Sequence, residues 1–185
     1  MKEKIEKSKR VLKLAAEMSQ TYYGQPLIVT YSGGKDSDVL LHLAETCLNK
    51  DEFEVLNSHT TVDAPETVYH IRDVFKRLVG GGIKATIRYS YNDDGTPKTM
   101  WNMIPRKLMP PTRIVRYCCA ELKETGTPNR MAALGVRAAE STKRQGRDIF
   151  GVRGGHTNKL HFFLLTIPRK CITMQKIVTR YGIAH

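Results

Sequence analysis

The sequence predicts an α/β protein in which a parallel twisted sheet carries helices on both faces, a Rossmann-like arrangement. Short apolar segments with the length of buried strands alternate along the chain with longer segments whose apolar residues recur at a helical period. Strands that alternate with helices in this way form parallel sheets through right-handed crossovers. A glycine-rich turn also follows the first apolar strand and opens a helical pattern, as at the phosphate-binding edge of such sheets.

The individual elements follow from local patterns. Residues 4–18 place apolar side chains on one helical face and lysines on the other, which predicts an amphipathic first helix. Pro65 stands at a position that the first turn of a helix tolerates, and three glycines at 80–82 end that helix. The other predicted elements are strands at 27–31, 54–60 and 85–90, a helix at 36–48, and a turn at 92–95.

Length and composition fit one folded domain. The chain has 185 residues, of which 41% are hydrophobic, enough to bury a core without disulfides. We expect an N-terminal amphipathic helix at 1–24, a nucleotide-binding domain at 25–155, and an atypical, basic and truncated tail at 156–185. The sequence holds no run of about 18 apolar residues, and residues 1–10 lack an apolar signal region. We therefore expect a cytoplasmic protein without a membrane segment.

The positive charge lies mostly in the second half of the chain. Residues 1–97 hold 13 Lys and Arg against 14 Asp and Glu, whereas residues 98–185 hold 17 against 4, and the whole chain carries a formal charge of +12. A basic half suits a polyanionic ligand, either a small nucleotide with several phosphates or a nucleic acid. The alternative is a basic surface that is merely solvated.

The motif with the most chemical content is Ser32-Gly33-Gly34-Lys35-Asp36-Ser37. Its glycines let the backbone approach an anion, the following helix start adds a partial positive charge, and Lys35 adds a full one. The spacing does not fit the P-loop of kinases and GTPases. It resembles the PP-loop of the ATP pyrophosphatase superfamily, whose members bind an adenine nucleotide.

The loops that follow the three strands should share one edge of the sheet, because ligands of open parallel sheets bind beyond the carboxyl ends of the strands. Asp63 lies in the second of these loops. Its carboxylate is placed to contact a ribose hydroxyl or a metal ion. The alternative, equally weighted, is that Asp63 only caps the helix that follows.

Two further clusters carry chemistry. Cys118 and Cys119 are adjacent and flanked by basic residues, which predicts lowered thiol pKa values and metal or redox chemistry, although a buried structural pair is the alternative. Cys47 lies in an apolar helical segment and is predicted to be a small core residue. Arg137 and Arg144 suit a fork for phosphate or sulfate. The alternative there is a charged helix start in which Glu140 pairs with a nearby base.

The ordered set of motifs resembles the phosphoadenosine phosphosulfate reductase family over roughly residues 25–150. The set comprises the PP-loop, the run at 61–67, Arg116-Tyr117-Cys118-Cys119, and Gly135-Val136-Arg137 with Arg144. The resemblance implies an adenine nucleotide α-hydrolase-like fold in which residues 32–37 hold phosphate or sulfate and Arg137 helps to bind it. The family includes reductases that release sulfite from an activated sulfate, and relatives that modify DNA with sulfur.

This resemblance supplies the functional expectations. The expected ligand is an adenine nucleotide, namely ATP, adenylyl sulfate or phosphoadenylyl sulfate, and Mg²⁺ is a candidate cofactor. Lys35, Cys118, Cys119 and Arg137 are the expected catalytic residues. The expected partners are a thiol reductant such as thioredoxin and further copies of the chain, with nucleic acid as a third candidate.

Departures from the family pattern leave rival functions open. Phosphoadenylyl sulfate reductases use a cysteine in a C-terminal Glu-Cys-Gly-type tail, which this sequence lacks. Relatives with an iron–sulfur cluster use four cysteines, but after Cys118 and Cys119 only Cys171 follows, which argues against a cluster, and a zinc site with His156 or His161 is less favoured still. The rivals are an ATP-cleaving sulfur-transfer enzyme that forms AMP and pyrophosphate, and a non-catalytic nucleotide-binding module.

Overall fold

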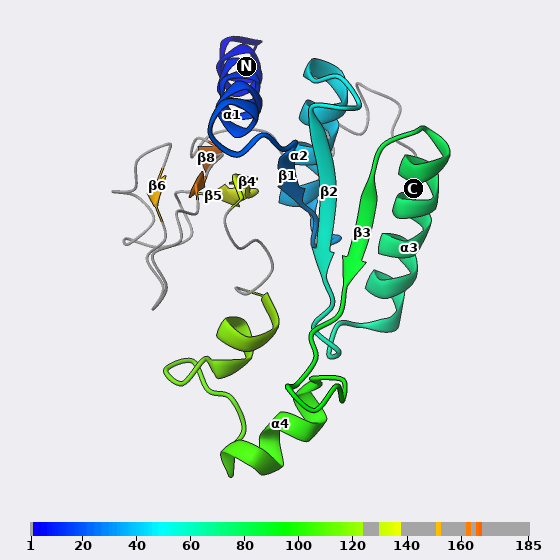
Figure 1. Ribbon diagram of the computed structural model, residues 1–185, viewed down its shortest axis with the longest axis vertical. Helices are drawn as coiled ribbons and strands as arrows, with labels where there is room; N and C mark the ends of the chain where they lie inside the picture. Colours follow the sequence, from blue (N-terminus) through cyan, green and yellow to red (C-terminus); the bar gives the residue numbers. More distant parts are fainter. Residues whose placement is uncertain (1, 124–129, 138–150, 153–161, 164–165, 168–185) are drawn as a thin grey trace.

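The computed structural model describes residues 2–123, 130–137, 151–152, 162–163 and 166–167, and four parallel strands make its main sheet (Figure 1). The strand order is β3-β2-β1-β4. The register pairs Thr30 with Leu56 and Ser58 with Arg88, so that the carboxyl ends of β1, β2 and β3 lie along one edge. The strands are β1 (Leu27–Thr30), β2 (Phe53–Ser58), β3 (Ala85–Arg88) and β4 (Ala132–Ala133).

Helices connect and cover these strands. The helices are α1 (Lys2–Tyr23), α2 (Lys35–Cys47), α3 (Pro65–Gly80) and α4 (Met100–Lys107), with a π-helical turn η1 (Cys119–Lys123). Helix α2 joins β1 to β2, and α3 joins β2 to β3, which confirms the predicted α/β class with a parallel sheet. Two small strand pairs complete the described part, parallel β5 (Val136–Arg137) with β8 (Thr166–Ile167) and antiparallel β6 (Gly151–Val152) with β7 (Phe162–Phe163).

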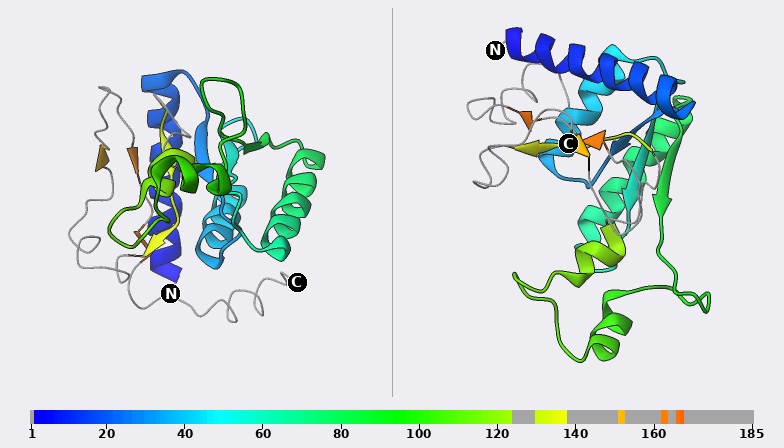
Figure 2. Two further views of the ribbon diagram at one scale, coloured as in Figure 1. Left: turned by 90° about the horizontal axis from the view of Figure 1, so that it is seen from below. Right: turned by 60° about the vertical axis from the view of Figure 1, so that its left-hand side comes forward.

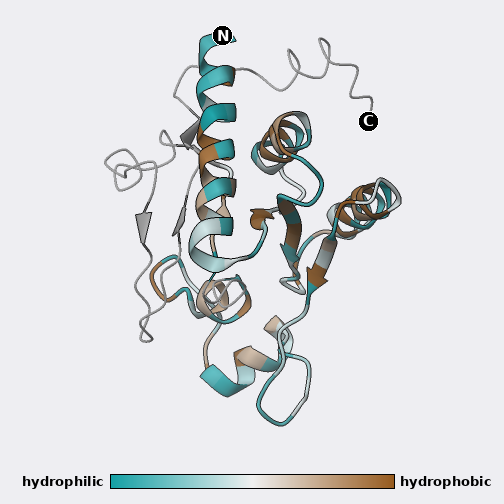
Figure 3. Ribbon diagram, turned by 45° about the horizontal axis from the view of Figure 1, so that its top comes forward, coloured by the Kyte–Doolittle hydropathy of each residue, from teal (hydrophilic) through white to brown (hydrophobic). Residues whose placement is uncertain are grey.

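The core lies between the sheet and helices α1, α2 and α3. Leu12 of α1, Leu40 of α2 and Phe75 of α3 are all buried in one apolar cluster with the sheet strands. Figure 3 shows the hydrophobic colour concentrated on the strands and on the inner faces of α2 and α3, while most of α1 is hydrophilic. Cys47 is half-buried and packs against this cluster, and burial raises its thiol pKa, as expected for a small core residue.

Helix α1 extends beyond the amphipathic pattern of residues 4–18 and lies within the segment 1–24 that was expected to form an N-terminal helix. No helix breaker occurs before Gly24, which has a positive φ of 60° and ends the helix. Helix α4 was not predicted, since it has only eight residues and contains Pro105. Its start does follow a capping rule, because the Thr99 hydroxyl accepts the backbone N–H of Asn102 and the Asn102 amide oxygen accepts the N–H of Thr99.

A buried ion pair joins three strands at their amino ends. Arg130 Nη1 lies 2.7 Å from Glu54 Oε1, and Arg130 Nη2 donates to the Pro26 carbonyl at 2.7 Å. Glu54 Oε2 is also 2.7 Å from Lys84 Nζ. Because Arg130 precedes β4, Glu54 lies in β2 and Pro26 precedes β1, these contacts tie the short strand β4 to the sheet. No helix in the described part of the chain is both long and apolar enough to cross a membrane.

Candidate functional site

The glycine-rich loop at residues 32–37 connects the carboxyl end of β1 to the first turn of α2, where the sequence predicted it. Gly33 has a positive φ of 72°, and a Cβ there would lie 3.0 Å from Ile71 Cγ1 and 3.1 Å from Thr67 Cγ2 of α3. Gly34 is the N-cap of α2 with extended backbone, and a Cβ there would meet only Ser32 Oγ, at 3.6 Å. The loop is therefore packed against α3 on the Gly33 side and open on the Gly34 side.

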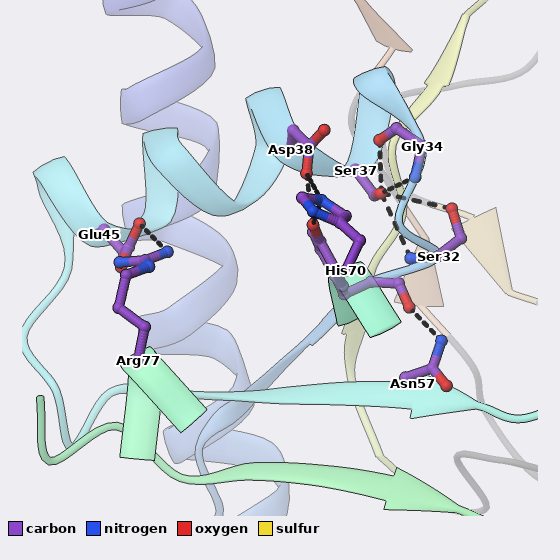
Figure 4. A network of polar contacts seen from close by, with 9 residues as sticks. Ser32, Gly34, Ser37, Asp38, Glu45, Asn57, His70 and Arg77 are labelled. Carbon is purple, nitrogen blue, oxygen red and sulfur yellow. Dashed lines mark hydrogen bonds and ion pairs between the residues drawn. The ribbon is translucent and has the colours of Figure 1, made fainter. Parts of the chain in front are cut away.

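The Ser37 hydroxyl holds the loop in this shape. Ser37 is buried, and its Oγ donates to the Gly34 carbonyl at 2.6 Å while it accepts the N–H groups of Gly34 at 3.1 Å and Ser32 at 3.2 Å (Figure 4). The structure thus places Ser37 inside the loop as an organiser. Ser32, Gly34 and Lys35 are exposed, and Asp36 is half-buried. The first N–H groups of α2, which have no partner within the helix, begin at Lys35.

A polar network lies directly behind the loop and was not predicted. The buried Tyr31 hydroxyl donates to Asp38 Oδ1 at 2.5 Å and lies 3.0 Å from His70 Nε2, so these contacts join the residue after β1 to α2 and α3 (Figure 4). Burial, and then the hydrogen bond to Asp38, raise the pKa of Tyr31 well above its ordinary value. At this site the phenol is therefore a neutral donor at physiological pH. The Asn57 amide also donates to the Tyr31 carbonyl, at 2.8 Å.

Helices α2 and α3 are joined a second time farther from the loop. Arg77 Nη1 lies 2.7 Å from Glu45 Oε1, and Figure 4 shows this ion pair and the His70 contact side by side along the two helices. Together with the close packing of Gly33 against α3, these contacts fix the loop relative to α3. A loop held in this way keeps its N–H groups aimed before a ligand arrives.

The loop after β2 contains Asp63, and its geometry corrects one interpretation. The N-cap of α3 is Ala64, without a side-chain hydrogen bond, while the Asp63 carboxylate accepts the Thr60 hydroxyl. Asp63 therefore does not cap the helix. Thr61, two residues before Asp63, has a positive φ of 65°. The Thr61 hydroxyl accepts the N–H of Met100, which links this loop to the start of α4.

A recess adjoins the glycine-rich loop at the carboxyl edge of the sheet. Its walls come from the ends of β2 and β3, from the loop after β2, and from the first two turns of α3, through Asn57, His59, Asp63, Val68, Ile71, Arg72 and Ile87. Ile71 is shared, because the same side chain packs against Gly33. The His59 ring stacks on Tyr89 at a centroid distance of 5.1 Å, so the loops after β2 and β3 meet as predicted.

Gly135 brings the Gly135-Val136-Arg137 segment to the same loop. A Cβ on Gly135 would lie 2.7 Å from the Asp36 carbonyl oxygen and 2.9 Å from the Asp36 carbonyl carbon, which leaves room for glycine alone. The sequence singled out Arg137 and did not assign this role to the glycine. Arg137 belongs to β5, where its backbone pairs with Ile167, and Arg144 lies outside the described residues.

The segment that follows α4 and carries the adjacent cysteines lies on the same side of the molecule as the carboxyl ends of the strands (Figures 1 and 2). Both are half-buried. Cys118 packs against a small cluster of Met100, Met103 and Leu122, and burial, followed by the charge of Cys119, raises its thiol pKa. The predicted lowering of both thiol pKa values is therefore wrong for Cys118. Arg116 Nη2 does donate to Cys119 Sγ, at 3.3 Å.

The described residues do not provide a four-cysteine site. Cys47 ends the 13-residue helix α2, about 20 Å along its axis from the glycine-rich loop at 1.5 Å per residue. The segment with Cys118 and Cys119 lies toward the carboxyl ends of the strands, whereas Cys47 lies at the opposite end of α2, so Cys47 does not fit a cluster with them. Within the described ranges, no group of three or more His, Cys, Asp or Glu side chains is placed to hold a metal ion. Cys171, His156 and His161 lie outside those ranges.

Comparisons with known proteins agree with this fold and loop. Residues 26–168 match the family described as the phosphoadenosine phosphosulfate reductase domain. No curated protein matches the chain. A solved structure, that of FMN adenylyltransferase from Candida glabrata, superposes with a TM-score of 0.52 at 16% identity over 89% of this chain and 50% of that chain. The chain spans about half of that protein, and a likeness at this identity shows the fold alone, which confirms the predicted adenine nucleotide α-hydrolase-like class.

Proposed function

This chain belongs to the phosphoadenosine phosphosulfate reductase domain family, and from that premise we propose that it binds a sulfonucleotide at residues 32–37 and releases sulfite from it by reduction. The observation that carries the proposal is the geometry of the loop. Gly33 and Ser37 lock its backbone, the open side lies at Gly34, and Lys35 is exposed at the start of α2. Such a surface binds an anion through N–H groups, the helix dipole and one full charge.

The recess beside the loop holds about 10 Å³, room for one water-sized group, so it is proposed to take a hydroxyl of the nucleoside and not the whole nucleoside. Val68, Ile71 and Ile87 supply apolar walls, and Ile71 also lies against Gly33, so the recess adjoins the packed side of the glycine-rich loop. Asp63 lines the recess, and its carboxylate is proposed to accept a ribose hydroxyl. Both alternatives for the anionic end, a sulfated phosphate and a triphosphate, would use the same loop.

The proposed reaction is a two-electron reduction in two steps. Cys119 attacks the sulfonate sulfur, so that an S–S bond forms, the S–O bond to the nucleotide phosphate breaks, and the nucleotide leaves as a phosphate anion. A thiol of an external dithiol reductant of the thioredoxin type then attacks the Cys119 sulfur. This second step releases sulfite and leaves a mixed disulfide, which the second thiol of the reductant resolves. Sulfur gains two electrons and two reductant thiols lose them.

Contacts at the tandem cysteines support Cys119 as the attacking residue. The Arg116 guanidinium donates to Cys119 Sγ, a charged contact that would stabilise negative charge on that sulfur. Cys118 packs in the small apolar cluster, and its raised pKa keeps it a thiol. Adjacent residues have Cα atoms about 3.8 Å apart, less than the roughly 4.4–6.8 Å of an ordinary disulfide, so the second thiol is assigned to an external reductant.

Turnover and binding assays test this proposal. We expect the purified chain to bind phosphoadenylyl sulfate or adenylyl sulfate more tightly than ATP, and to release one sulfite per nucleotide when a dithiol reductant is present. Cys119→Ser should abolish sulfite release while nucleotide binding remains. Cys118→Ser is the matched control and should keep turnover, because its sulfur packs rather than reacts. Sulfite release that survives in Cys119→Ser would contradict the assignment.

A second function, cleavage of ATP to AMP and pyrophosphate in a transfer reaction, would use the same loop, because the open side at Gly34 and the exposed Lys35 would also accept a triphosphate. In this case the loop would stabilise the charge on the leaving pyrophosphate, with Mg²⁺ neutralising part of it. Pyrophosphate release from ATP and Mg²⁺, with no sulfite from either sulfonucleotide, would favour this second function over the first.

A further inference from the structure

The segment at residues 98–123, termed here the basic edge, lies beyond the carboxyl ends of the strands (Figures 1 and 2), and several of its large apolar side chains are exposed. Trp101 is 72% exposed, and Leu108 and Ile114 are more than 90% exposed. Tyr91, just before the segment, is 59% exposed. Several large exposed apolar side chains within one short segment are unusual and indicate a candidate site of interaction with another molecule.

The same segment is strongly positive. It contains six Lys and Arg residues and a single acidic residue, Glu121. Glu121 is engaged by Lys98 at 2.7 Å and by Lys107 at 3.5 Å, and Lys98 holds the pKa of that carboxyl below its ordinary value. Arg113 and Lys123 are exposed to solvent. Positive charge interleaved with an exposed aromatic ring is the pattern of a surface that binds single-stranded nucleic acid.

The basic edge is a built structure with its own packing. Met100, Met103 and Leu122 form a small buried cluster that joins α4 to η1, separate from the main core. The Tyr117 hydroxyl donates to the Met109 carbonyl at 2.8 Å and closes the loop between the two elements. The exposed Trp101 is therefore carried by a helix that is packed in place, which lowers the entropy cost of binding.

We propose that the basic edge binds single-stranded nucleic acid, with Trp101 stacking on a base and Arg113 and Lys123 contacting phosphates. The charge argues against a second copy of this chain as the occupant, because two such segments would bring like charges together. A duplex fits less well, since its bases are already stacked and present no free face to Trp101. This inference goes beyond the proposed nucleotide function and does not rest on it.

Trp101 is the only tryptophan of the chain, so its fluorescence reports on this surface alone. We expect an oligothymidine of about 12 nucleotides to quench that fluorescence at low salt. The logarithm of affinity should fall with the logarithm of salt concentration, by about 0.7 for each phosphate contacted. Oligothymidine contains no adenine, and adenine-nucleotide binding measured separately on the same protein reports on the glycine-rich loop, so failure here is distinguishable from failure of that loop.

Variants measured by the anisotropy of a labelled oligothymidine separate stacking from charge. Trp101→Ala should weaken binding about fivefold or more, and Trp101→Phe should weaken it less. Arg113→Gln and Lys123→Gln should each reduce the salt slope by about 0.7. Lys2→Gln and Lys7→Gln, exposed charges on α1, are the charge-matched controls and should leave the slope unchanged.

Three results would overturn the proposal. The first is equal affinity for duplex and single strands with no quenching, which would make the surface a general polyanion binder. The second is an α1 control variant with as large an effect as Arg113→Gln. The third is self-association of the wild type that Trp101→Ala abolishes, measured by sedimentation without nucleic acid, which would assign the apolar side chains to contact between copies.

Discussion

Alanine substitution at the two adjacent loop glycines should give opposite effects on folding and binding. Gly33→Ala places a side chain on a backbone with a φ of 72°, which costs about 1–2 kcal/mol, and its Cβ would lie 3.0–3.2 Å from Ile71 and Thr67. Overpacking of this kind adds about 1–3 kcal/mol. We therefore expect the free energy of unfolding to fall by about 3 kcal/mol, which corresponds to a fall in Tm of about 6–12 °C for a chain of this length.

Gly34→Ala should leave folding almost unchanged and impair the ligand site. Its φ of −99° suits any residue, and the nearest atom to its Cβ is Ser32 Oγ at 3.6 Å. The added methyl group would instead occupy the open side of the loop, where the anion is proposed to sit. We expect a Tm within about 2 °C of the wild type and nucleotide affinity reduced about tenfold or more, measured by thermal unfolding and calorimetric titration. A stable Gly33→Ala together with an unfolded Gly34→Ala would refute this reasoning.

The remaining predictions concern the supports of the site. Gly135→Ala should lower the free energy of unfolding by about 2 kcal/mol and weaken nucleotide binding, because its Cβ would lie 2.7 Å from the Asp36 backbone. An unchanged Tm and an unchanged nucleotide affinity would contradict this prediction. Tyr31→Phe should lower the free energy of unfolding by about 2 kcal/mol at pH 7, because the hydrogen bond to Asp38 is lost. Because the pKa of Tyr31 is raised in the folded state, wild-type stability should fall as the pH rises past about 10, and denaturant titrations should show a smaller fall in Tyr31→Phe. Arg130→Met should lower the free energy of unfolding by about 3 kcal/mol, because the Glu54 carboxylate loses its ion-pair partner Arg130. The double variant with Glu54→Leu should recover part of this loss, measured by chemical denaturation.

The main sheet could be predicted from the sequence because its signals are local. The apolar strand at 27–30 and the helix that starts at Pro65 carry their own periodicity and breakers, and the observed bounds differ by a few residues at most. The shared edge of the loops followed from the parallel order alone. Helix α4 was not predicted because a segment of eight residues with an internal proline is too short to show a helical period. The capping pair Thr99 and Asn102 was nevertheless visible in the sequence.

The glycine-rich loop was recognised as a motif, but the roles within it required the structure. Sequence treats Ser37 as one more phosphate ligand, whereas its buried hydroxyl binds the loop backbone. The pairing of Tyr31 and Asp38 with His70 joins residues 39 positions apart, and no local pattern reports such a contact. The predicted pKa of Cys118 was wrong because sequence shows the neighbouring charges and not the apolar cluster that buries the thiol.

The open side of residues 32–37 is proposed to bind the anionic end of an adenine nucleotide. Calorimetric titration of phosphoadenylyl sulfate, adenylyl sulfate and ATP into the wild type, Gly34→Ala and Lys35→Ala measures this contact. We predict saturable binding of at least one nucleotide to the wild type, about tenfold or greater weakening in each variant, and unfolding temperatures that match the wild type. Equal affinity in all three proteins would contradict the claim, because the loop would then make no contact with the ligand.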